Sequence, residues 1–204
     1  MCHHARERVE TPGDEIRVLI VDDHPGLRAE LKALLTTEVE IAAVAAPATS
    51  VEAWRDAEAA RSNVVVLDPD SGLADGLRLC FELKNRVGGP SVVIYSAYAD
   101  RLLAAPAKIA QADALVSKTA PVSELLDAIR LAASGGATGP AVASDALLAV
   151  SARLLEEDLP VMQKLLSRTP LRAIADDLRL DEREVRDRAL RIIERFEPSG
   201  GRRA

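Results

Sequence analysis

Acidic residues follow two apolar runs of the chain and are of the types that bind a metal ion. Asp22 and Asp23 come directly after the run 16–21, and Asp68 comes directly after the run 63–67. Carboxylates that converge on one point repel each other unless a hard cation such as Mg²⁺ neutralises them, and the same cation can bind a phosphoryl group. The pattern therefore predicts a site for a metal ion and phosphate.

Two further polar residues stand at the ends of later apolar runs. Ser96 ends the run 91–96, and Lys118 follows the run 114–117. A single aspartate after a strand is usually a helix cap or a turn residue. Polar residues at the ends of four such runs make that interpretation the weaker one.

The segment 16–134 alternates short β-branched runs with longer amphipathic runs. Strands that are apolar along their whole length are typical of a parallel sheet covered on both faces by helices. Right-handed crossovers then give a doubly wound sheet, whose ligands bind beyond the carboxyl ends of the strands. We therefore predict an α/β fold with a five-stranded, parallel, doubly wound (flavodoxin-like) sheet. The predicted strands are 16–21, 41–45, 63–67, 91–96 and 114–117, and the predicted helices are 26–37, 50–61, 76–86, 101–110 and 122–133.

A run of small and turn-forming residues, Gly135-Gly136-Ala137-Thr138-Gly139-Pro140, follows the last of these helices. Such a run neither continues a helix nor packs against one. Beyond it the apolar periodicity is helical, without a strand-like run. The predicted organisation is a flexible tail 1–14, an α/β domain 15–134, a linker 135–143, a small all-helical domain 144–197 and a flexible tail 198–204.

The composition limits the classes of function. The chain has 204 residues, a formal net charge of -6 and no long uncharged apolar run, so we expect a protein of the cytoplasm with no membrane segment. Its two cysteines, Cys2 and Cys80, predict no disulfide framework. Cys2, His3 and His4 could hold a metal ion, but adjacent ligands in a tail give poor coordination geometry. Because the chain is acidic, any contact with nucleic acid must be local.

Three segments resemble the receiver domains of two-component response regulators. Val21 to Arg28 reads Val-Asp-Asp-His-Pro-Gly-Leu-Arg, which is similar to the acidic pair of that family. Val-Val-Val-Leu-Asp at 64–68 is similar to the phosphoacceptor strand, and Val-Ser-Lys at 116–118 is similar to the segment that holds the family's lysine. The resemblance covers 16–134, and Asp75-Gly76 falls where the family begins its third helix.

The resemblance implies a role for each residue of the acidic site. Asp68 would be the nucleophile that takes a phosphoryl group from a phosphohistidine of a sensor histidine kinase. Asp22 and Asp23 would hold Mg²⁺ together with Asp68, and the backbone carbonyl of Asp70 would complete the metal site. His24 precedes a predicted helix start, where a polar loop residue is unremarkable, and we assign it no chemistry.

The resemblance also implies roles for the polar residues after the last two strands. Lys118 would pair with the phosphoryl oxygens, and Ser96 would move to hydrogen-bond them. Three positions depart from the family pattern. Leu115 stands where many relatives have an aromatic switch residue, and Gly72 stands where they more often have proline. Pro69 removes a backbone N–H beside the phosphoacceptor, which predicts slower phosphorylation, or none if the loop geometry differs from that of the family.

The C-terminal part contains two closely spaced helices. The segment 171–178 is a short amphipathic helix, and Asp181 can cap a second helix with Glu184 closing a capping box. Two helices joined so tightly predict a helix-turn-helix. The segment 154–196 resembles the LuxR-type output domain of the NarL and FixJ response regulators, with 158–166 as its first helix.

The resemblance implies that arginines of these helices contact DNA bases or phosphates. The arginines are Arg172, Arg183, Arg186, Arg188 and Arg191. The segment 145–204 has 12 basic and 12 acidic residues, so counterion release adds little affinity and we expect a homodimer that doubles the contacts. The open alternative is that the arginines pair with Asp187 and Glu194 on a solvated helix.

These observations favour a response regulator that is phosphorylated on Asp68 and regulates transcription by binding duplex DNA, and they disfavour a metabolic enzyme. The alternative is a degenerate receiver, regulated without phosphate, whose helical domain binds a protein such as a sigma factor or a kinase. A flavin-binding protein is disfavoured, because the carboxylates would repel a flavin phosphate unless Mg²⁺ were present.

Overall fold

The structure is a computed structural model that describes residues 15–45, 61–70, 72–99, 101–138, 142 and 144–196. The predicted tails 1–14 and 198–204 lie outside the described residues. The last residue of the predicted helical domain, at position 197, also lies outside them. Nearly all of the predicted helix 50–61 and part of the predicted linker 135–143 lie outside them as well.

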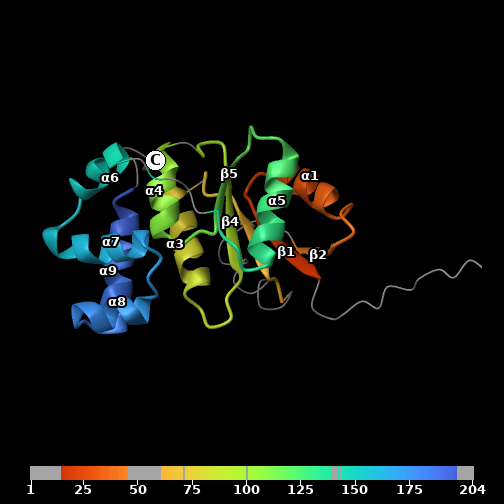
Figure 1. The fold of residues 1–204 in the computed structure, drawn as a ribbon. Helices are drawn as coiled ribbons and strands as arrows, with labels where there is room; N and C mark the ends of the chain where they lie inside the picture. Colours follow the sequence, from red (N-terminus) through yellow and green to blue (C-terminus); the bar gives the residue numbers. More distant parts are fainter. Residues whose placement is uncertain are drawn as a thin grey trace, which may run out of the picture.

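One parallel sheet forms the centre of the N-terminal part (Figure 1). Its strands are β1 (Ile16–Val21), β2 (Ile41–Ala45), β3 (Val64–Leu67), β4 (Ser91–Ser96) and β5 (Ala114–Ser117). They lie in the order β2-β1-β3-β4-β5, and all neighbouring strands are parallel. The predicted parallel α/β fold is confirmed, because strands of continuous apolar residues form an interior that is covered on both faces.

Helices cover both faces of this sheet. The helices α1 (Pro25–Leu35) and α5 (Val122–Ala133) pack on one face, and α3 (Leu73–Lys84) and α4 (Arg101–Ile109) pack on the other. Successive residues of each strand point to opposite faces, so one strand supplies both cores. In β3, for example, the side chains alternate between the two hydrophobic clusters and all are buried.

The helix α3 begins at Leu73, three residues before the predicted start at Gly76. Ala74 lies on the buried face together with Leu77, so burial of apolar surface favours a helical turn before the glycine. The amide N–H of Gly76 donates to the carbonyl of Gly72 at 2.8 Å, which places Gly76 inside the helix.

All the regular elements among the described residues of the C-terminal part are helical, as predicted. It contains α6 (Ser144–Ser151), a 3₁₀ turn (Glu156–Asp158), α7 (Leu159–Leu166), α8 (Leu171–Leu178) and α9 (Glu182–Glu194). Among the helices that the structure describes, none combines the length and the apolar character needed to cross a membrane.

The predicted turn between α8 and α9 forms around Arg179 and Asp181. Arg179 adopts the left-handed conformation with φ 56°, and this ends α8. The Asp181 carboxylate accepts a hydrogen bond from the N–H of Glu184 at 2.7 Å, so Asp181 is the predicted N-cap of α9. A closed capping box would have the Glu184 carboxylate accept from the backbone N–H of Asp181. The carboxylate accepts instead from the guanidinium group of Arg188 at 2.5 Å, one helical turn further along.

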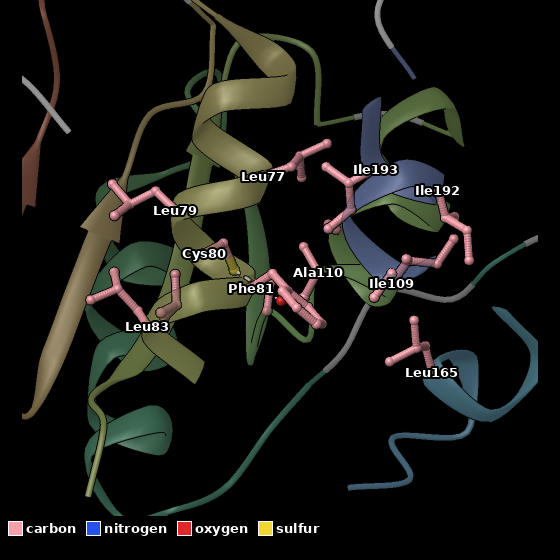
Figure 2. Packing of buried hydrophobic residues seen from close by; sticks show 14 of the residues in the cluster. Leu77, Leu79, Cys80, Phe81, Leu83, Ile109, Ala110, Leu165, Ile192 and Ile193 are labelled. Atoms are coloured by element: carbon pink, nitrogen blue, oxygen red, sulfur yellow. Dashed lines mark hydrogen bonds between the residues drawn. The ribbon is translucent and has the colours of Figure 1, made fainter. Parts of the chain in front are cut away.

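The helices α7 and α9 pack against α3 and α4, so the two parts of the chain share one hydrophobic cluster. Figure 2 shows Ile193 of α9 facing Leu77 of α3, and Ile109 of α4 beside Ile192 and Leu165. The predicted helical domain therefore lies directly on the α/β domain and does not stand apart from it.

Polar contacts border this apolar interface. The side chain of Gln111 donates to the backbone carbonyl of Leu165 at 2.7 Å. Arg168 lies 3.4 Å from the carboxylate of Asp113 and also donates to the carbonyl of Ala112. The partners on the α/β side, Gln111 to Asp113, lie in the segment between α4 and β5. Their contacts with Leu165 and Arg168 fix the position of α7 along that edge.

We expect Leu165→Ala to lower the free energy of unfolding by about 2–5 kcal/mol, because a fully buried leucine is removed from the shared cluster. The same substitution at Leu148, whose relative exposure is 71%, should change it by less than about 0.5 kcal/mol. Urea unfolding with hydrogen exchange read at both α3 and α9 makes the measurement. Loss of protection in α9 alone would show that the two parts unfold separately.

Candidate functional site

The carboxyl ends of β1 and β3 bring three predicted acidic residues together. Asp22 and Asp23 follow β1, and Asp68 follows β3, which is the neighbouring strand. Ligand atoms of these residues and of His24 all lie within 4.8 Å of one another. The Nδ1 atom of His24 lies 2.9 Å from Asp23 and 3.4 Å from Asp22. Sequence reasoning gave His24 no role, although its position beside the acidic pair was a signal.

The buried carboxylate of Asp22 has one oxygen that accepts a hydrogen bond and one that accepts none from the described residues. Its Oδ1 atom accepts from the N–H of His24 at 2.7 Å, and Arg28 donates to its backbone carbonyl at 2.6 Å. Its Oδ2 atom accepts no hydrogen bond from any described residue, although its side chain is only 1% exposed. A buried carboxylate oxygen that accepts no hydrogen bond and has its ammonium partner, Lys118, only at 3.8 Å is costly, so the residues fit a bound cation such as Mg²⁺.

Lys118, at the end of β5, reaches across to three carboxylates. Its Nζ atom lies 2.6 Å from Asp68, 3.3 Å from Asp70 and 3.8 Å from Asp22. Burial lowers the pKa of this ammonium group, but the hydrogen bond to Asp68 and the charges of Asp68, Asp22 and Asp70 outweigh it. The pKa of Lys118 is therefore raised above its ordinary value, and the side chain stays positively charged.

Asp68 is held on both of its oxygens. Its Oδ1 atom accepts from the N–H of Asp70 at 2.9 Å, and its Oδ2 atom accepts from Lys118. Burial raises the pKa of Asp68, and the negative charge of Asp70 acts in the same direction, whereas Lys118 acts against them. A cation bound beside Asp68 would offset the cost of burying its charge.

The side chain of Asp70 contacts the loop after β4. Its Oδ1 atom accepts from the hydroxyl of Ser96, and its Oδ2 atom accepts from the N–H of Ala97 at 2.9 Å. Burial raises the pKa of Asp70, but these hydrogen bonds and Lys118 outweigh it and hold the pKa below its usual value. Sequence reasoning considered only the backbone carbonyl of Asp70, although an acidic residue two positions after Asp68 was a visible signal.

All the residues of the predicted site thus meet at one edge of the sheet. They are Asp22, Asp23, Asp68, Asp70, Ser96 and Lys118. Four carboxylates and one ammonium group leave the site negative, which is the electrostatic condition for binding a divalent cation.

The loop that presents Asp68 and Asp70 packs tightly against α3. A Cβ atom at Gly76 would lie 2.7 Å from both Cα and Cβ of Pro69. This distance is too short for any real side chain, so only glycine lets the helix approach the loop so closely. Gly76 therefore has a packing role and not the helix-starting role that the sequence indicated.

The five arginines predicted to contact DNA fall into two groups. Arg172 and Arg183 are exposed and Arg186 is half-buried, and none of the three has a hydrogen bond or ion pair to another described residue. The other two arginines, Arg188 and Arg191, have hydrogen-bond and ion-pair partners. Arg188 donates to the carbonyl of Glu157 at 2.6 Å, besides its pair with Glu184.

Arg191 is held by the turn before α7. Its guanidinium group lies 2.8 Å from the carboxylate of Asp158 and 3.4 Å from that of Glu157. The side chain of Asp158 is only 4% exposed, so Arg191 compensates a buried charge. The proposed pairing of the arginines with Asp187 and Glu194 is not seen among these contacts, where the partners are Glu157, Asp158 and Glu184.

Comparison with known proteins identifies the N-terminal part. The family model described as the response regulator receiver domain matches residues 18–130. The transcriptional regulatory protein LiaR of Bacillus subtilis (strain 168) is 28% identical over 120 residues, which cover 59% of this chain and 57% of LiaR. The DNA-binding transcriptional activator DevR/DosR of Mycobacterium tuberculosis is 30% identical over 120 residues, which cover 59% of this chain and 55% of that protein. The match spans little more than half the length of these curated relatives.

Solved structures extend the similarity along the chain. The response regulator ChrA of a heme-sensing two-component system is 28% identical with a TM-score of 0.52, and the match covers 89% of this chain and 90% of ChrA. The response regulator RcsB in its complex with DNA is 17% identical with a TM-score of 0.56, and the match covers 89% of this chain and 92% of RcsB. At this low identity, the RcsB match supports the fold alone.

We expect Gly76→Ala to destabilise the protein by about 1–3 kcal/mol, because the added methyl group overlaps Pro69 and must displace it. Gly26→Ala in α1 is the matched control, since a Cβ atom there meets nothing within 4 Å. The control should be stabilising by up to about 1 kcal/mol, because alanine favours a helix over glycine. Thermal unfolding of both variants compares the signs, and equal effects would contradict the packing role of Gly76.

Proposed function

The chain belongs to the response regulator receiver domain family, and on this premise we propose that it is a transcriptional regulator phosphorylated on Asp68. The phosphoryl donor is a phosphohistidine of a sensor histidine kinase, and the target of the C-terminal helices is duplex DNA. The observation that supports the acidic site most directly is the buried Oδ2 atom of Asp22, which accepts no hydrogen bond from the described residues and lies 3.8 Å from the ammonium group of Lys118.

Asp68 acts as the nucleophile in this proposal. A carboxylate oxygen of Asp68 forms the new bond to phosphorus while the bond between phosphorus and the donor histidine nitrogen breaks, and the leaving imidazole takes a proton. Lys118 already contacts the Asp68 oxygen at 2.6 Å, so it can stabilise the negative charge of the transferred group without a large movement.

Asp22, Asp23, Asp68 and the backbone carbonyl of Asp70 would hold the Mg²⁺ ion. When bound, this ion supplies positive charge that draws the donor phosphate toward the carboxylates. Asp22 is fixed for this role by the N–H of His24 and by burial, which leave one of its oxygens free to coordinate.

Ser96 links the phosphorylation site to α4. It ends β4, and α4 follows a short loop and packs under α7 and α9. A phosphoryl group on Asp68 would compete for the Ser96 hydroxyl and the Lys118 ammonium. A change at Ser96 therefore lies at the start of a contiguous path to the C-terminal helices.

For DNA binding, we propose that α9 enters the major groove and that Arg183 and Arg186 contact it, with Arg172 of α8 reaching a phosphate. These three side chains have no competing partner among the described residues. Arg188 and Arg191 would contact DNA only by leaving their present acidic partners. Because the helical part has no net positive charge, a homodimer would supply the second set of contacts.

The proposed division of the chain follows the prediction from sequence, with the receiver domain at 15–134, the linker at 135–143 and the helix-turn-helix domain at 144–197. The shared cluster indicates that the two domains act as one packed unit in this state. As a regulator whose output is binding, the protein is proposed to have no metabolic substrate.

Incubation with acetyl phosphate and Mg²⁺ tests the phosphorylation. We expect the intact mass to rise by one phosphoryl group, and Asp68→Asn or removal of Mg²⁺ to abolish the rise, because the amide is no nucleophile and the metal ion is lost. Asp176→Asn is the matched control, since Asp176 is exposed on α8, far along the chain from the site. A wild-type chain that gains no mass would contradict the proposed phosphorylation.

Alanine substitutions test the DNA contacts. We expect Arg183→Ala to weaken DNA binding and to lower the salt dependence of the association constant by about one ion, if Arg183 contacts a phosphate. Arg191→Ala should instead lower stability by about 1–3 kcal/mol, because it leaves Asp158 buried without its partner. Fluorescence anisotropy with promoter DNA over a salt series, together with urea unfolding, separates the two. Undiminished DNA affinity of Arg183→Ala would contradict the role of α9.

A further inference from the structure

The phosphoryl site contains three hydrogen-bond donors that converge on one point. They are the Ser96 hydroxyl, the N–H of Ala97 and the ammonium group of Lys118. These donors come from the ends of β4 and β5, the two strands that follow β3, with its Asp68 carboxylate, in the sheet order. An acceptor-only anion is the ligand that such a set of donors binds.

Asp70 already fills this set of donors with its own carboxylate. One oxygen accepts from Ser96, and the other accepts from Ala97 at 2.9 Å and lies 3.3 Å from Lys118. The side chain of Asp70 is 11% exposed, so these are contacts of a largely enclosed group.

A role in shaping the local loop does not account for these contacts. The helix α3 begins directly after this loop, but its N-cap is Gly72 and no side chain caps it. The loop itself is closed by backbone groups, with the N–H of Gly72 donating to the carbonyl of Pro69 at 3.2 Å. The Asp70 carboxylate turns away from both and reaches the β4 loop, so its partners are those of the site.

We propose that the Asp70 carboxylate is a built-in occupant of the phosphoryl position, held by Ser96, Ala97 and Lys118 until a phosphoryl group on Asp68 displaces it. This inference rests on the proposed function, because it takes the same donors to be the ligands of the phosphoryl group. It assigns the side chain of Asp70 a role that is separate from any metal ligation by its backbone carbonyl.

Two consequences follow from this arrangement. An incoming phosphoryl group must break the contacts of Asp70 and meets one more negative charge, so phosphorylation is opposed. The loop after β4 is also drawn toward the site before phosphorylation, and the N–H of Tyr98 donates to the Ser96 oxygen at 3.0 Å within it. The unphosphorylated chain therefore already has the Ser96 contact that phosphorylation would otherwise create.

Beryllium trifluoride, a stable mimic of a phosphoryl group on aspartate, tests the inference in the full chain with Mg²⁺. We expect Asp70→Ala to bind it about tenfold more tightly than the wild type, or more, because the competitor and its charge are removed. Asp70→Asn keeps an acceptor oxygen without the charge and should fall between them. Asp75→Ala removes an exposed carboxylate of α3 and should bind like the wild type.

Amide hydrogen exchange at Ala97 provides a second measurement that needs no ligand. We expect the Ala97 amide to exchange faster in Asp70→Ala than in the wild type and in Asp75→Ala, because it loses its acceptor, and to regain protection when beryllium trifluoride is added. Binding by the variant that is no tighter than wild type, with unchanged exchange at Ala97, would overturn the inference.

The two measurements also separate this inference from the proposed function. If neither the wild type nor Asp70→Ala binds beryllium trifluoride but the Ala97 amide is released in the variant, Asp70 holds the donors of a receiver that takes no phosphoryl group. That result would overturn the proposed phosphorylation and the competition, and it would leave Asp70 as a permanent internal ligand of Ser96. If Asp70→Ala does not fold, Asp70→Asn serves for both measurements.

Discussion

The ammonium group of Lys118 contacts three carboxylates of the site at once. It lies within 3.8 Å of Asp22, Asp68 and Asp70, which come from the ends of β1 and β3. Without it, these strand ends would hold uncompensated negative charge in a region of low dielectric constant. The parallel sheet provides the arrangement, because it places the carboxyl ends of neighbouring strands at one edge, with β5 close enough for a lysine to reach across.

The elements that the sequence predicted well are those whose identity depends on local pattern. The strands β1, β2, β4 and β5 match their predicted bounds, because each is a short run of mainly apolar residues, as strands of a parallel sheet covered by helices are. The start of α3 was predicted wrongly because a glycine in a sequence usually indicates the boundary of a helix. Gly76 instead lies inside the helix, where it allows a close tertiary contact with Pro69. The contacts of the Asp70 side chain were missed because they are tertiary contacts too. Its partners lie at the ends of β4 and β5, and the sequence does not show which of them a side chain in the loop after β3 reaches.

Packing of the C-terminal helices was beyond prediction because amphipathicity does not say which surface an apolar face meets. The helix α9 buries Val185, Ala189, Ile192 and Ile193, and a helix-turn-helix can use such a face internally. In this chain, part of that face also meets α3 and α4. Arg183, on the opposite side of α9 from these residues, is exposed. The same packing that buries one side of the helix leaves the other available for a partner.

The two parts of the molecule are joined through α4. Its preceding loop contacts Asp70 through Ser96 and Ala97, and its own buried residue Ile109 lies in the cluster with Leu165 and Ile192. A displacement of α4 that follows a change at Ser96 would therefore alter the surface on which α7 and α9 rest. Close packing makes such a surface respond by a discrete rearrangement and not by gradual deformation. Since Asp70 holds Ser96, the state of one carboxylate can bias the position of the helices that bear the exposed arginines.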